Sequence, residues 1–155
     1  MKKICFCSVV LAAAVAFSGE FKVGFSRVDI TPPLGSFMPG YYKDRRAKEV
    51  LDPLEINCVA FSDGEKIAIL QQIDTEAISD TVASLMKDAI HKATGVDHDS
   101  MILHASHTHD GGYLVMKRVP GMDNVSSSQG DGVPENASEI DVLYVKMAIS
   151  RVLVS

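Results

Sequence analysis

Two histidines one residue apart, His107 and His109, carry the strongest chemical signal in the chain. They follow the apolar run 101–103 and precede the pair Gly111-Gly112. In an extended backbone, residues i and i+2 point to the same side, so we expect both imidazoles to face one position. Imidazole is a common zinc ligand, and a catalytic zinc keeps a position open for water. The pattern predicts a metal or catalytic site, and two exposed loop histidines are the alternative.

The elements that must position this pair form a βαβ unit. The hydrophobic pattern predicts strands over 66–73 and 100–106, with a helix over 79–94 between them. Such a crossover makes the two strands parallel. Asp74 and the two histidines then follow the carboxyl ends of neighbouring strands, where open α/β sheets place their sites. We expect the glycine pair to allow a sharp turn there and close approach of a substrate.

The predicted helix has start and stop signals and one apolar stripe. Ser79 is a favourable N-cap, and Gly95 is the expected C-terminal breaker. His91 falls on the polar side and is expected to be solvated. The stripe consists of Ile78, Val82, Leu85, Met86, Ala89, Ile90 and Ala93.

Two earlier strands complete the predicted sheet. Residues 21–30 alternate between apolar and polar, and residues 54–61 form a hairpin with 66–73 around an Asp-Gly turn. The charged segment 43–48 is expected to be a solvated connection. The fold class is therefore α/β, with a mixed sheet that contains an N-terminal hairpin and a βαβ unit.

Three further expectations concern single residues and the end of the chain. His104 should be a packed or capped strand histidine on the face opposite His107, and Cys58 should be a buried, inert thiol. Residues 120–138 are rich in Gly, Ser, Asp and Asn and predict a long loop. A helix should follow over 140–154, with a broad apolar face made of Ile140, Leu143, Val145, Met147, Ile149, Val152 and Leu153.

The first 17 residues are typical of a secretory signal peptide. Lys2 and Lys3 precede an apolar run that ends in Ala-Val-Ala, and cleavage is expected near Ala16. The protein is therefore expected to be secreted or periplasmic. Loss of residues 1–16 removes two lysines and no acid, which takes the formal charge from −5 to −7. This acidic balance, without a basic stripe, argues against nucleic-acid binding.

Several segments, in order, resemble the neutral, non-lysosomal ceramidase family. The resemblance spans roughly residues 23–113. Its segments are Gly24-Phe25-Ser26-Arg27-Val28-Asp29-Ile30-Thr31-Pro32-Pro33, Met38-Pro39-Gly40-Tyr41, Asp52-Pro53-Leu54, Ile73-Asp74 and Ala105-Ser106-His107-Thr108-His109-Asp110-Gly111.

The resemblance implies a secreted, zinc-dependent (Zn2+) amidase that hydrolyses N-acylsphingosine or a similar lipid amide, with peripheral contact to a membrane surface. It implies that His107 is a zinc ligand and that His109 lies beside the metal and contacts the reacting groups. The family motif continues Ser-Gly, where this chain has Asp110-Gly111. The family's other zinc ligands, a second His, a Glu and a Tyr, come from later segments. Residues 18–155 are thus expected to be the N-terminal portion of a catalytic domain, inactive as this chain.

Two other classes of function remain open. One is a different metallohydrolase with an HxH motif. A metallo-β-lactamase fold usually continues with an Asp-His pair, but here Asp110 comes one place early and no His follows it. An amidohydrolase barrel places HxH on its first strand, whereas at least three strands precede it here. The other class is a non-enzymatic secreted binding domain whose histidines are incidental.

Overall fold

The computed structural model describes residues 19–41, 43–115 and 138–153. The signal peptide expected at residues 1–17 and nearly all of the loop expected over 120–138 lie outside these residues. The described elements are β1 (Lys22–Asp29), β2 (Glu55–Ser62), β3 (Ile67–Ile73), α1 (Asp80–Thr94), a 3-10 turn η1 (His98–Ser100), β4 (Met101–Ala105) and α2 (Glu139–Arg151).

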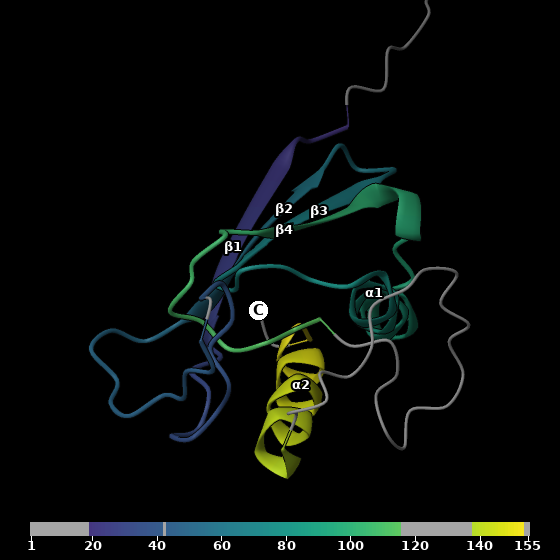
Figure 1. Cartoon of the computed structure of the whole chain (residues 1–155). Helices are drawn as coiled ribbons and strands as arrows, with labels where there is room; N and C mark the ends of the chain where they lie inside the picture. The colour runs from purple at the N-terminus through teal and green to yellow at the C-terminus, as the bar shows by residue number, and fades with distance from the viewer. Residues whose placement is uncertain (1–18, 42, 116–137, 154–155) are drawn as a thin grey trace, which may run out of the picture.

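The four strands form one mixed sheet in the order β1-β2-β3-β4 (Figure 1). β2 is antiparallel to both β1 and β3, whereas β3 and β4 are parallel and are joined through α1. At the hairpin turn Gly64 has a φ of +95°, and the Asp63 carboxylate accepts hydrogen bonds from the backbone of Glu65 and Lys66. The structure thus confirms the predicted α/β class, the hairpin and the βαβ unit.

Helix α1 begins and ends where its capping residues predict. The Ser79 hydroxyl accepts a hydrogen bond from the Val82 N–H at 3.3 Å. Gly95 has a φ of +76°, and its N–H donates to the His91 carbonyl at 2.8 Å. The predicted stripe is buried at Val82, Leu85, Met86 and Ile90, while Ala93 at its end is exposed.

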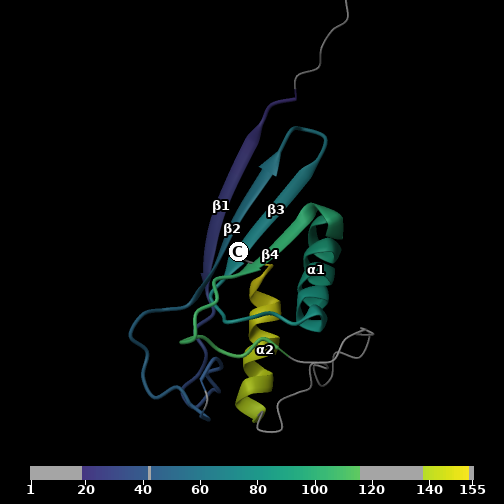
Figure 2. The ribbon, with the colours of Figure 1, turned by 45° about the horizontal axis from the view of Figure 1, so that its top comes forward.

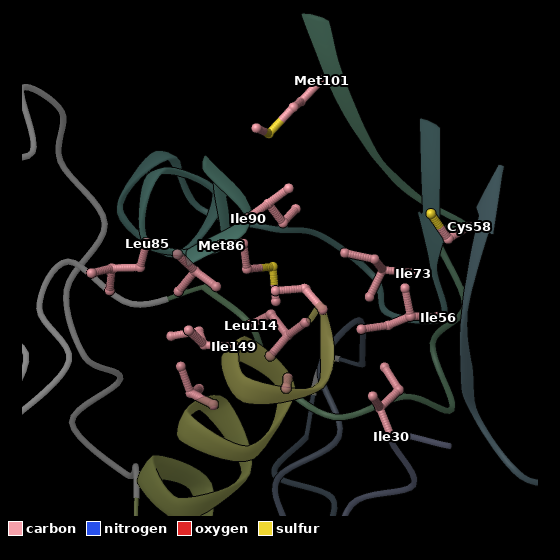
Figure 3. Close-up of a cluster of buried hydrophobic side chains, with 14 of the residues drawn as sticks. Ile30, Ile56, Cys58, Ile73, Leu85, Met86, Ile90, Met101, Leu114 and Ile149 are labelled. Carbon is pink, nitrogen blue, oxygen red and sulfur yellow. The ribbon is translucent and has the colours of Figure 1, made fainter. Parts of the chain in front are cut away.

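Both helices pack on one face of the sheet (Figure 2). Alternate strand residues such as Ile56, Ile73 and Met101 meet the α1 stripe and α2 in a single core (Figure 3). Cys58 lies in this core, and burial raises the pKa of its thiol. The expectation that Cys58 is buried is confirmed, and a raised pKa favours the less reactive thiol form.

The opposite face of the sheet is not covered by any described element. Phe25, Val59, Leu70 and Ile102 lie in register across its four strands, and Phe25 and Ile102 are 69% and 62% exposed. His104 lies on this face of the edge strand β4 and is exposed. The expectation of a packed His104 was wrong because both helices cover the other face.

Helix α2 buries a narrower stripe than the sequence predicts. Its buried residues are Asp141, Tyr144, Val145, Ala148 and Ile149. Ile140 and Leu143, which were assigned to the apolar face, are 37% and 62% exposed. Each of them directly precedes a buried residue, Asp141 or Tyr144, and therefore lies outside the buried stripe. The predicted apolar face thus combined buried and exposed positions of the helix. Across the described residues, neither helix is long and apolar enough to cross a membrane.

A buried carboxylate joins α2 to the loop between β1 and β2. Asp141 is 2% exposed and accepts hydrogen bonds from the Phe37 N–H at 2.7 Å, the Ser138 N–H at 2.8 Å and the Arg46 guanidinium at 2.8 Å. Burial by itself would raise the pKa of Asp141. Together, the hydrogen-bond donors more than offset this effect, so the pKa lies below its usual value. The segment 43–48 was expected to be a solvated connection. The contact between Arg46 and Asp141 shows that it also anchors the loop to α2.

We predict that Leu85→Ala lowers the free energy of unfolding by about 2–5 kcal/mol, because it leaves a cavity in the core. Leu85 is only 9% exposed. Leu143→Ala on the exposed side of α2 is the matched control and should change stability by less than about 0.5 kcal/mol. Urea unfolding followed by circular dichroism measures both. Equal losses in the two variants would place Leu85 outside the core.

We also predict that Asp141→Asn destabilises the protein at neutral pH by at least about 1.5 kcal/mol, the usual contribution of a hydrogen bond to a charged group. Because the folded pKa is lowered, this stability is fully present above the unfolded value near about 3.9 and is lost as the pH falls through the folded pKa. Asp44→Asn is the control, since the Asp44 carboxylate is exposed and lies 3.9 Å from Arg46. Urea unfolding between pH 7 and pH 2 should show a shallower acid loss only in Asp141→Asn, and parallel curves would contradict this.

Candidate metal centre

The two histidines lie in the loop that follows β4. The last sheet-like contact is the Ser106 N–H, which donates to the Ile73 carbonyl at 3.0 Å. The chain then turns, and His107 takes a left-handed conformation with a φ of +63°. The expected extended backbone was therefore wrong at His107. The imidazoles of His107 and His109 nevertheless meet, with ring centroids 5.1 Å apart.

The proton position on His107 is set by a backbone carbonyl. Its Nδ1 lies 2.8 Å from the carbonyl oxygen of Glu76, in the loop between β3 and α1. Because a carbonyl only accepts, Nδ1 carries the proton and Nε2 keeps its lone pair. A metal-binding histidine commonly donates its second ring N–H in this way. Nε2 is therefore the His107 nitrogen that is available to a metal ion.

Glu76 also brings a carboxylate to the pair. One potential ligand atom each from Glu76, His107 and His109 lie within 4.8 Å of one another. Glu76 was not predicted as part of the site because 31 residues separate it from His107. The available signal was its position three residues after β3, at the same sheet edge as the histidines.

Asp74, the acid that sequence analysis placed at this edge, has a structural role. Its carboxylate accepts hydrogen bonds from the Glu55 N–H at 3.1 Å and from the Gln72 amide at 2.8 Å. Asp74 thus ties the end of β3 to the start of β2. It is not part of the three-residue cluster.

Two imidazoles and one carboxylate fit a zinc ion. Zinc takes nitrogen and oxygen ligands, and a catalytic zinc has three protein ligands and an open fourth position. His109 and Glu76 are partly buried and His107 is exposed, so the cluster opens to solvent on one side. We call Glu76, His107 and His109 the metal triad.

The loop between β1 and β2 forms one wall of the metal triad. Gly40 has a φ of +87°, and a Cβ at this position would overlap the imidazole of His109. The Tyr41 ring meets the same imidazole edge to face, with centroids 5.9 Å apart. The segment 38–41, one of the segments that resemble the ceramidase family, therefore lies directly against His109.

The glycine pair packs the loop against the protein and does not leave space for a substrate. Neither Gly111 nor Gly112 has a positive φ, and both are buried. A Cβ on Gly111 would lie 3.0 Å from the Asp74 carbonyl, and one on Gly112 would overlap the Tyr144 ring. The expected use of these glycines for substrate approach is corrected to close packing against β3 and α2.

The three other histidines of the described residues lie apart from the triad, His104 on the uncovered face of the sheet and His91 and His98 near α1. His98 Nε2 lies 3.2 Å from the Asp88 carboxylate, and His91 Nδ1 lies 2.8 Å from the Val96 carbonyl. Both are near the C-terminal end of α1. His91 is exposed, as its place on the polar side of the helix predicted.

No family model and no curated protein matches the chain. Two solved structures are similar in fold. Neutral ceramidase from Pseudomonas aeruginosa is 19% identical with a TM-score of 0.55, over 60% of this chain and 16% of that chain. A ceramidase complexed with C2 is 18% identical with a TM-score of 0.53, over 60% of this chain and 15% of that chain. The matched region is thus a small part of those proteins, and the likeness confirms that its fold is that of part of a ceramidase.

We predict that Gly40→Ala weakens zinc binding, because the new methyl group displaces the His109 imidazole. Gly35→Ala in the same loop is the matched control. Gly35 has a similar φ of +90°, but its Cβ would meet only the Ile140 side chain at 3.7 Å. Both variants pay the strain of a left-handed alanine, roughly 1–2 kcal/mol. Zinc titration calorimetry should show weaker binding only for Gly40→Ala, and equal affinities would contradict the contact with His109.

Proposed function

We propose that this chain is part of the catalytic domain of a zinc-dependent amidase. The amidase would hydrolyse the amide bond of N-acylsphingosine or a similar lipid amide. The observation that carries the proposal is the metal triad at the carboxyl ends of two parallel strands. The fold likeness to neutral ceramidase supports the reaction class. The signal-like residues 1–17 support action outside the cytoplasm.

The metal triad supplies the ligands for the ion. Glu76 provides a carboxylate oxygen and His107 provides Nε2, whose lone pair is kept free by the hydrogen bond from Nδ1 to the Glu76 carbonyl. The position of His109 allows it to complete a set of three ligands. When bound, zinc polarises an amide carbonyl and lowers the pKa of a coordinated water toward neutrality.

His109 has a second role open to it. The family resemblance implies that it contacts the reacting groups beside the metal. There, a neutral imidazole takes up or returns a proton, or donates a hydrogen bond to the oxyanion. The ligand role is supported by a ring nitrogen of His109 that lies within 4.8 Å of a possible ligand atom of both Glu76 and His107. His109→Ala separates the two roles.

We predict that, in a longer protein that also contains the later segments of the catalytic domain, His107→Ala and Glu76→Gln each lower zinc content and hydrolysis of a fluorescent N-acylsphingosine, by roughly tenfold or more. His109→Ala should lose zinc as well if His109 is the third ligand. Zinc that remains bound while hydrolysis falls about 10²–10⁴-fold would assign it the proton-transfer role. Elemental analysis after dialysis and a turnover assay at pH 7 measure the two quantities.

His104→Ala is the matched control, because His104 is an exposed histidine three residues before His107 on the uncovered face of the sheet. It should change neither zinc content nor turnover. Full zinc content in both His107→Ala and Glu76→Gln would contradict the metal centre. Zinc binding without turnover of any lipid amide by the longer protein would contradict the amidase.

A further inference from the structure

Asp110 connects the histidine loop to the loop between β1 and β2. Its Oδ1 accepts a hydrogen bond from the Tyr41 hydroxyl at 3.3 Å and pairs with the Arg45 guanidinium at 3.0 Å. The same guanidinium lies over the Tyr41 ring, 4.3 Å from its centroid. Each of the side chains of Tyr41, Arg45 and Asp110 therefore contacts the other two. We call these three residues the Asp110 clamp.

The Asp110 clamp holds the aromatic ring that touches the metal triad. The Tyr41 ring meets the His109 imidazole at an interplanar angle of 85°. Gly40, the residue before Tyr41, lies against the same imidazole. His109 is thus confined by the loop that Asp110 anchors.

The exposure of the clamp indicates what it contributes. The side chains of Arg45 and Asp110 are 44% and 64% exposed, and ion pairs of this kind add little to the stability of the fold. The contacts instead restrict a loop and a ring at the edge of the metal triad. Fixing a binding group before its ligand arrives removes part of the ordering cost from the binding step.

We propose that Asp110 is a positioning residue, which holds Tyr41 and Arg45 so that the His109 imidazole stays beside His107 and Glu76. This inference rests on the metal site proposed above. It gives a role to the residue at which the chain departs from the Ser-Gly motif of the family that it resembles. A serine hydroxyl carries no charge with which to pair Arg45, and it extends less far than a carboxylate.

Removal of the Asp110 carboxylate should therefore loosen His109 without unfolding the protein. Asp110→Ala should weaken zinc binding by roughly tenfold, at the lower end of the effect of residues that orient metal ligands. Asp110→Asn keeps an oxygen acceptor and should recover part of that loss. Asp88→Ala is the matched control, since Asp88 is an exposed aspartate that pairs with a histidine away from the triad.

Two readouts on the full chain test the proposal. The first is the zinc dissociation constant from competition with a chromophoric chelator. The second is the NMR shift of the His109 ring protons in the metal-free protein, where the Tyr41 ring current acts on them. Asp110→Ala should move these shifts toward those of Tyr41→Ala, while circular dichroism stays unchanged.

Unchanged His109 shifts in Asp110→Ala would overturn the proposal, and so would altered shifts with an unchanged zinc dissociation constant. A loss of equal size in Asp88→Ala would also overturn it. If the wild-type chain binds no zinc, that result would instead contradict the proposed metal site. In that case the metal-free spectra still decide whether Asp110 positions His109.

Discussion

The hydrogen bond between His107 Nδ1 and the Glu76 carbonyl is the interaction on which the candidate site depends. It joins the loop after β3 to the loop after β4 at a distance of 2.8 Å, and it fixes which nitrogen of His107 remains free. The left-handed backbone of His107 turns the ring toward that carbonyl. Backbone conformations of this kind cost energy for residues other than glycine and persist where surrounding contacts over-determine them. Here the contact that compensates for the cost also leaves Nε2 of His107 available for the proposed metal ion.

A second set of contacts holds the loop between β1 and β2 against the metal triad. The loop between β1 and β2 has little regular structure, so its path depends on side-chain contacts. Phe37 and Arg46, which flank the middle of the loop, donate hydrogen bonds to the buried carboxylate of Asp141. Between them, Tyr41 donates to Asp110 in the histidine loop. The loop is thus held by α2 and by the histidine loop, and Gly40, next to Tyr41, approaches His109 more closely than any larger residue could.

The sheet, the hairpin and α1 follow from local signals in the sequence. Alternation of apolar residues, an Asp-Gly turn and the caps at Ser79 and Gly95 each act within a few residues. The candidate site depends on contacts that have no such local signal. Glu76 joins the histidines only through the crossover of the βαβ unit. The stripe of α2 was misplaced because Asp141, a polar residue, occupies a buried position that hydrophobic periodicity does not predict.

The central claim is that Glu76, His107 and His109 hold one zinc ion. X-ray absorption spectroscopy of the zinc-loaded protein tests this most directly, because it reports the atoms bound to the metal. We predict nitrogen and oxygen ligands at about 2.0–2.2 Å, with the scattering pattern of two imidazoles. A shell without imidazole scattering would contradict the metal triad, and a shell with a single imidazole would remove His109 from it.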